Sequence, residues 1–119
     1  MDKIRSHKDL KVWQESMDFV VMIYEITAQF PSNETFGLIS QLRRASVSIP
    51  SNIAEGAGRK GAKEFSRFLY IALGSLSEVE TQLEIALRLQ YLKNVDEVNK
   101  RIYFTRSMLA NLIKSVGKG

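Results

Sequence analysis

The sequence contains 119 residues, of which 45% are hydrophobic and 25% charged, with a formal net charge of +4, a balance typical of one soluble globular domain, here residues 1–119. It has no cysteine and one histidine, which excludes disulfides and thiolate metal sites, and we expect no metal and no cofactor. No apolar run approaches the roughly 20 residues that cross a bilayer, and no signal peptide is recognisable, so we expect a cytoplasmic protein without a membrane partner.

The first predicted helix spans residues 9–30, with Asp9 as its N-terminal cap and Pro31 as its stop. Apolar residues at intervals of three and four form two lines along it. The first line is Leu10, Trp13, Met17, Val20 and Tyr24, and the second is Val12, Phe19, Ile23, Ile26 and Phe30. Together they cover more of the helix than a small monomer usually buries. Either both lines face neighbours within one bundle, or one faces the core and the other a second subunit.

The second predicted helix spans residues 36–55 and is capped by Thr35. Pro50 lies inside this helix, where it removes a backbone donor and collides with the carbonyl of Ser46, so we expect it to kink the helix or divide it in two. We expect nearby hydroxyls to bond the freed backbone groups. These hydroxyls belong to Ser46, Ser48 and Ser51, and the apolar seam of the helix is Leu38, Leu42, Ala45, Ile49 and Ile53.

The third and fourth predicted helices span residues 62–92 and 95–116. Their apolar seams alternate steps of three and four, which is typical of left-handed bundle packing. The third seam is Phe65, Leu69, Ala72, Leu76, Val79, Leu83, Ala86 and Gln90, and the fourth is Val95, Val98, Ile102, Thr105, Leu109, Leu112 and Val116. Four helices with short connections fold most simply as an antiparallel up-down-up-down four-helix bundle, so the predicted fold class is all-α.

Gly56, Gly58 and Gly61 reproduce the G-x-G-x-x-G spacing of a dinucleotide-binding turn. That turn follows a β-strand, whereas the residues before Gly56 have a helical period, so we interpret the match as a coincidence. We expect Gly56 and Gly58 to end the second helix in left-handed conformations and Gly61 to free the entry to the third.

Up-and-down topology brings the start of the first helix, the turn between the second and third, and the end of the fourth to one end of the bundle. Cations at this end are Lys3, Arg5, Lys8, Lys11, Arg59, Lys60, Lys63, Arg67, Lys114 and Lys118, and the nearby acids are Asp2, Asp9, Glu55 and Glu64. We expect Arg43 and Arg44 to extend this patch along the second helix.

Such a basic end suits phosphate backbones, which bind by counterion release, and the amides at the start of the third helix add an anion site. No aromatic-interleaved basic motif accompanies the patch, so base-specific recognition is not predicted. A basic end that is merely solvated is the open alternative.

The run of residues 49–92 resembles the signature of the 23S rRNA intervening-sequence protein family, and residues 7–20 resemble that family's first helix. The residues that carry the resemblance are Pro50, Ala54-Glu55-Gly56, Glu64-Phe65, Phe68-Leu69, Gly74-Ser75-Leu76, Glu78 and Thr81-Gln82-Leu83. The similarity covers residues 6–116. It implies a bacterial four-helix bundle that assembles as a ring-like homopentamer and has no known enzymatic activity. A related group serves diversity-generating retroelements, where a basic pentamer engages nucleic acid and a reverse transcriptase.

We therefore expect a non-enzymatic homo-oligomer that binds RNA or DNA backbones through its basic end, with a nucleic-acid-processing protein as a further partner. The expected binding residues are Arg59, Lys60, Lys63, Arg67, Lys8, Lys11, Arg43 and Arg44. The alternative is a protein–protein interaction scaffold with no physiological nucleic-acid ligand. No catalytic residue is expected, because the sequence offers no nucleophile–base pair, metal cluster or phosphate loop in a suitable context, and Glu80 and Glu84 fit a solvated helix face.

Overall fold

The computed structural model describes residues 6–118 and contains four long α-helices with no strand in that part of the chain. The helices are α1 (Lys11–Thr27), α2 (Leu38–Ala57), α3 (Ala62–Arg88) and α4 (Asp96–Lys118), and two short 3-10 helices, η1 (His7–Asp9) and η2 (Ser32–Glu34), precede α1 and α2. The molecule is elongated, with principal extents of 46 × 25 × 19 Å. The expected all-α class with four helices is confirmed for these residues.

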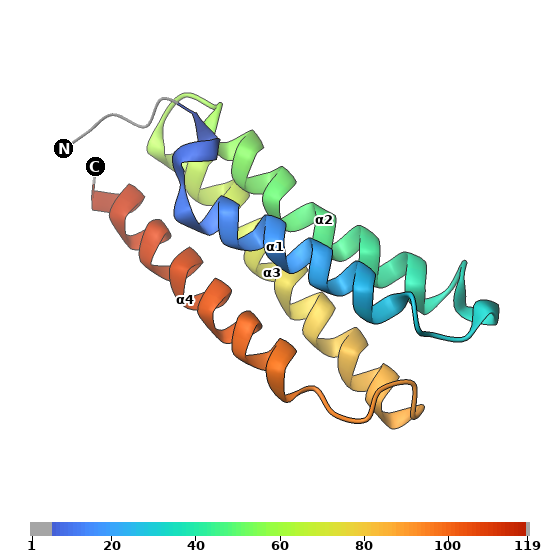
Figure 1. Cartoon of the computed structure of the whole chain (residues 1–119). Helices are drawn as coiled ribbons and strands as arrows, with labels where there is room; N and C mark the ends of the chain where they lie inside the picture. The colour runs from blue at the N-terminus through green and yellow to red at the C-terminus, as the bar shows by residue number, and fades with distance from the viewer. Residues whose placement is uncertain (1–5, 119) are drawn as a thin grey trace.

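The helices contact one another in chain order, α1 with α2, α2 with α3 and α3 with α4, and α4 also contacts α1. In Figure 1 the beginning of α1, the turn between α2 and α3 and the end of α4 lie toward the same end of the molecule, at the left. The connections from α1 to α2 and from α3 to α4 lie toward the opposite end. Three segments that are far apart in the sequence and rich in cations therefore lie toward the same end of the molecule.

The core combines one side of the first helix with most of the apolar seams that the sequence predicts for the last three helices. Leu42, Ile49 and Ile53 of α2 pack with Leu76 and Leu83 of α3, all within one buried cluster. Each such side chain contributes roughly 1.5–3 kcal/mol by leaving water, so these seams supply much of the stability of the fold. In α4 the buried residues are Val98, Ile102, Thr105 and Leu109.

The first helix buries its second apolar line more deeply than its first, of which only Leu10 is buried. Phe19 and Ile23 of the second line have no exposed surface, whereas Met17 and Tyr24 of the first line remain 42% exposed. The neighbouring Val21 is also exposed. Within the chain, therefore, the two lines do not both face bundle neighbours, and the first line has an uncovered outer side.

Two predicted N-terminal caps are wrong. Asp9 lies inside η1, and the residue at the cap position of α1 is Leu10, which makes no side-chain capping bond. Thr35 donates its hydroxyl hydrogen bond to the carbonyl of Ser32 instead of capping α2. Glu34 takes that role, since its Oε1 accepts a hydrogen bond of 3.0 Å from the amide of Leu38. A carboxylate one turn before the helix replaces the expected hydroxyl because η2 folds it back toward the helix start.

The third helix ends at Arg88, four residues earlier than predicted, because Gln90 adopts a left-handed conformation with φ of 68°. The amides of Gln90 and Tyr91 donate to the carbonyls of Leu87 and Ala86, respectively. This pair of bonds is a Schellman motif, which satisfies carbonyls at the end of the helix. Gln90 is exposed and does not belong to the apolar seam.

Pro50 does not divide the second helix, since α2 is continuous from Leu38 to Ala57. The predicted role of the serines is also incorrect for two of them. The Ser46 hydroxyl donates to the carbonyl of Arg43, and the Ser48 hydroxyl lies 2.9 Å from that of Ser75 on α3. These hydroxyls therefore serve the helix itself and its contact with α3.

Candidate nucleic-acid interface

The turn between α2 and α3 combines a tight helix contact with an exposed tip. Gly56 is buried inside α2, where a Cβ atom would lie 2.8 Å from the Cβ of Phe68 on α3. Gly58 has φ of −85°, and only Gly61, with φ of 91°, is left-handed. The expectation of left-handed Gly56 and Gly58 is wrong, whereas Gly61 lies at the start of α3, where its positive φ agrees with the expectation that it frees the entry to that helix. Because the two helices approach closely, residues 58–61 form a tight turn with an exposed tip.

Two arginines at this turn are paired with acids of the neighbouring helix ends. Arg59 pairs with Glu55 at 2.8 Å, and Arg67 pairs with Glu64 at 3.0 Å. Both guanidinium groups also lie over the ring of Phe68, at 5.2 Å and 4.5 Å from its centroid. The two arginines therefore brace the α2–α3 contact in addition to carrying charge.

The lowered pKa of Glu64 reflects the cations that lie around its carboxylate. It is lowered, first by the hydrogen bond from Arg67 and further by the charges of Arg67, Arg59 and Lys63, against a smaller upward effect of desolvation. Three cations from the end of α2 and the start of α3 therefore surround one carboxylate. Lys60 and Lys63 are exposed and pair with no acid among residues 6–118, so their ammonium groups are available to a ligand.

The N-terminal lysines lie near this turn. The short helix η1 contacts α2, and Figure 1 shows it at the same end as the α2–α3 turn. The backbone of Lys8 is held by two hydrogen bonds, one from its amide to the Ser6 hydroxyl and one from the Gln14 side chain to its carbonyl. The side chains of Lys8 and Lys11 are exposed. The predicted contributions of Lys3 and Arg5 lie outside the described residues.

Arg43 and Arg44 do not extend the basic end. Arg43 donates from Nε to the Thr27 hydroxyl at 2.9 Å and from Nη2 to the Tyr24 carbonyl at 3.3 Å, and it lies over the Tyr24 ring. It therefore braces α1 against α2. At a rise of about 1.5 Å per residue, it lies roughly 21 Å before the end of α2. Arg44 follows it and lines the same side groove as Phe36.

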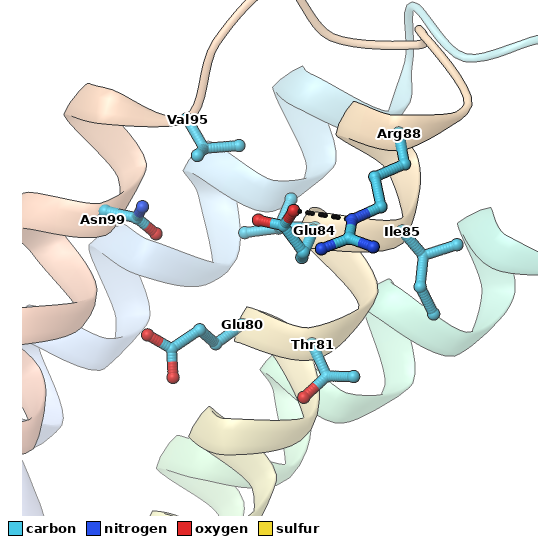
Figure 2. A pocket seen from close by; sticks show the side chains of 8 residues that line it. Glu80, Thr81, Glu84, Ile85, Arg88, Val95 and Asn99 are labelled. Atoms are coloured by element: carbon cyan, nitrogen blue, oxygen red, sulfur yellow. Dashed lines mark hydrogen bonds and ion pairs between the residues drawn. The ribbon is translucent and has the colours of Figure 1, made fainter.

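A hollow of about 410 Å³ between α3 and α4 contains the paired carboxylates of the third helix. Figure 2 shows Glu84 bonded to Arg88 on one side, with Val95 and Asn99 across the hollow, and the ion pair measures 3.0 Å. Glu80 is paired with Arg106 of α4 at 2.9 Å. Both acids are thus neutralised by arginines at the surface, which matches the predicted solvated face.

Across residues 6–118, no three His, Asp or Glu side chains lie together in a way that could hold a metal ion. None of the helices formed by these residues is long and apolar enough to cross a membrane.

The outer face of α4 carries an arrangement that the sequence reasoning missed. Tyr103 and Phe104 are 67% and 58% exposed, and their ring centroids lie 6.0 Å apart. They follow the exposed Lys100, and no acidic residue occurs after Glu97. The sequence signal for this arrangement is the helical spacing of the polar and aromatic residues on the face opposite the apolar seam.

This fold and charge distribution define a class of protein: a small all-α protein with four packed helices and one basic end. The chain belongs to the 23S rRNA-intervening sequence protein family, whose pattern it matches over residues 8–111. This confirms the resemblance seen in its motifs.

A solved structure is also similar. It is a crystal structure of a protein with unknown function from the S23 ribosomal protein family of Bacteroides thetaiotaomicron VPI-5482. The two chains are 27% identical with a TM-score of 0.76, and the match covers 87% of this chain and 98% of the other. The comparison with curated proteins found no match.

Proposed function

We propose that this protein is a non-enzymatic homo-oligomer that binds RNA or DNA backbones through the end of an antiparallel up-down-up-down bundle. The observation that carries the proposal is the pair of exposed lysines, Lys60 and Lys63, at the tip of the α2–α3 turn. The exposed Lys8 and Lys11 add charge from the N-terminal segment. Ammonium groups on flexible stems neutralise phosphates without a fixed geometry, which suits binding to a backbone rather than to bases.

The ion pairs of Arg59 and Arg67 limit the affinity of the basic end for nucleic acid. Because Glu55 and Glu64 already neutralise the two arginines, the lysines carry most of the net charge of the patch. About four phosphate contacts per subunit would give a slope of log affinity against log salt of roughly −3 to −4. One subunit alone would then bind weakly at physiological salt, and several subunits would be needed for a stable complex.

Self-association is supported by the uncovered outer line of α1. Trp13, Met17 and Val20 line a groove of about 350 Å³ together with Val47 and Pro50 of α2. Exposed apolar surface of this kind on a small protein is typical of a subunit contact. The resemblance to the family implies a ring of five subunits, which would bring several basic ends to one nucleic-acid strand.

The test is a titration of labelled structured RNA and matched DNA at two salt concentrations. Lys60→Glu with Lys63→Glu should weaken binding at least tenfold and flatten the salt dependence, with helicity and oligomeric mass unchanged. Lys93→Glu, which reverses an exposed charge at the opposite end, is the control and should have a small effect. Equal losses in the Lys60→Glu, Lys63→Glu double variant and in Lys93→Glu would show that the basic end does not carry the binding.

A protein–protein interaction scaffold is the second candidate, and the apolar groove on α1 and α2 favours it. In that case the positive charge serves solubility, and nucleic-acid binding disappears near physiological salt for every sequence tested. Met17→Glu in the groove would then abolish capture of a protein partner while leaving the weak nucleic-acid binding unchanged.

A further inference from the structure

The outward face of α4 lies outside the groove on α1 and α2, and its last lysines, Lys114 and Lys118, belong to the basic end. Positions 100, 104, 107, 111, 114 and 118 are separated by steps of three and four, so they share one face of the helix. The side chains on or beside this face are Lys100, Tyr103, Phe104, Ser107, Asn111, Lys114 and Lys118. The face runs about 27 Å along the helix at 1.5 Å per residue.

Positive charge predominates on this face beyond Asp96 and Glu97 in the first turn of α4. Its lysines are exposed, and the sequence contains no acidic residue from Val98 onward. The other cations of the helix point elsewhere, because Arg101 pairs with Glu15 of α1 and Arg106 with Glu80 of α3. A shallow hollow beside the two aromatic rings is lined by Asp96, Asn99 and Lys100.

Within residues 6–118, both aromatic rings lie outside the hydrophobic core cluster. Tyr103 and Phe104 contact each other edge to face at an interplanar angle of 71°, and both present ring surface to solvent. Burying a ring of this size is favourable, so an occupant with flat apolar faces is expected. Nucleobases have such faces, and each base stacked on an aromatic side chain contributes affinity with little dependence on its identity.

We propose that the outer face of α4 binds single-stranded nucleic acid, with bases stacked on Tyr103 and Phe104 and phosphates neutralised by Lys100, Lys114 and Lys118. This inference rests on the proposed function and deepens it, because it names the strand type. The end of α4 lies at the same end of the molecule as the α2–α3 turn, so the face continues the basic end along the side of the bundle. A duplex keeps its bases stacked internally and would meet only the lysines.

Charge decides between a nucleic-acid strand and a second copy of the chain as the occupant. The central part of a subunit interface is depleted of charged residues, especially lysine. Here lysines lie on both sides of the rings, and the acids of this helix, Asp96 and Glu97, are confined to its first turn before Lys100. That arrangement complements a polyanion and opposes a contact between like-charged subunits.

The test compares three probes of about 12 nucleotides: a single strand, the same strand made abasic, and a duplex. The intact protein should bind the single strand roughly tenfold or more tightly than the abasic strand. Tyr103→Ala with Phe104→Ala should remove that preference while leaving abasic and duplex binding and the salt slope unchanged. Tyr103→Trp with Phe104→Trp should retain it. Tyr70→Ala, which removes an exposed ring from α3, is the matched control and should not affect the preference.

The outcomes separate this inference from the proposed function. Equal affinity of the intact protein for the single and abasic strands would overturn base stacking and leave backbone binding in place. Absence of binding to all three probes at moderate salt would overturn both. A change in oligomeric mass caused by the double alanine variant, measured by light scattering, would reassign the aromatic pair to a subunit contact and overturn the inference.

Discussion

Gly56 of α2 lies directly against Phe68 of α3, and a Cβ atom added to Gly56 would come within 2.8 Å of the Phe68 Cβ. The same atom would also meet the ring and carbonyl of Phe65. The glycine therefore sets the distance between the two helices that carry the basic turn.

Gly56→Ala should destabilise the protein. The helix propensity of alanine favours the variant by about 1 kcal/mol, but overpacking a buried backbone contact costs roughly 1–3 kcal/mol. Gly74→Ala is the control, because Gly74 lies in α3 with open space where a Cβ would stand, and it should stabilise by about 0.5–1 kcal/mol. Urea denaturation measures both changes. Shifts in the same direction would show that the packing argument is wrong.

Glu34 should make stability depend on pH in the acid range. Its pKa is lowered, first by the hydrogen bond from the Leu38 amide and then by that from the Tyr91 hydroxyl, against a smaller effect of desolvation. A carboxyl whose folded pKa is depressed stabilises the protein above its unfolded pKa of about 4.3, and this contribution is lost as pH falls through the folded value.

The difference in unfolding free energy between the natural protein and Glu34→Gln should therefore be largest above pH ~5 and shrink as the pH is lowered. Thermal or urea unfolding over a pH series measures it. Glu25→Gln, at an exposed position, serves as the control. A constant difference across the series would contradict a role for the ionised Glu34.

Gln90→Gly should stabilise the protein by about 1 kcal/mol. Gln90 occupies the left-handed position of the Schellman motif with φ of 68°, where a side chain costs roughly 1–2 kcal/mol and glycine costs little. Glycine also raises the entropy of the unfolded chain, which reduces the gain. Arg88→Gly, in the last helical turn of α3, should instead destabilise by about 1 kcal/mol. The melting temperatures of the two variants should move in opposite directions.

The ion pair between Arg101 and Glu15 should contribute more than the one between Arg88 and Glu84. The Arg101 and Glu15 side chains are 34% and 25% exposed, and Arg101 Nε is buried without a hydrogen-bond partner. Removing Glu15 would leave the guanidinium largely unpaired, so Glu15→Ala should cost roughly 1–3 kcal/mol.

Glu84→Ala provides the comparison, since the Arg88 and Glu84 side chains are 81% and 50% exposed. An exposed pair on one helix contributes no more than about 0.5 kcal/mol. Chemical denaturation at low and high salt should give a large, weakly salt-dependent loss for Glu15→Ala and a small loss for Glu84→Ala. Similar losses of stability in the two variants would contradict the larger contribution of the less exposed Arg101–Glu15 pair.

Periodicity predicted the core because it is a property of the chain itself. Leu42, Ile49, Leu76 and Leu83 recur at the spacing of a helix face, and all are buried. The helix ends were less predictable. Thr35 is a reasonable cap by residue type, yet Glu34 caps α2 because η2 folds its side chain back to the Leu38 amide. The choice between such neighbours depends on backbone geometry that residue type does not specify.

The sequence alone determined four helices, their buried seams in α2, α3 and α4, and the cations of the α2–α3 turn, since these follow from residue spacing at 3.6 residues per turn. Only the tertiary structure decided which line of α1 enters the core and that Arg43 braces Thr27 and Tyr24. It also left Tyr103 and Phe104 uncovered. The reason is that spacing specifies which residues share a face of a helix, whereas the packing of neighbouring helices specifies which faces are covered.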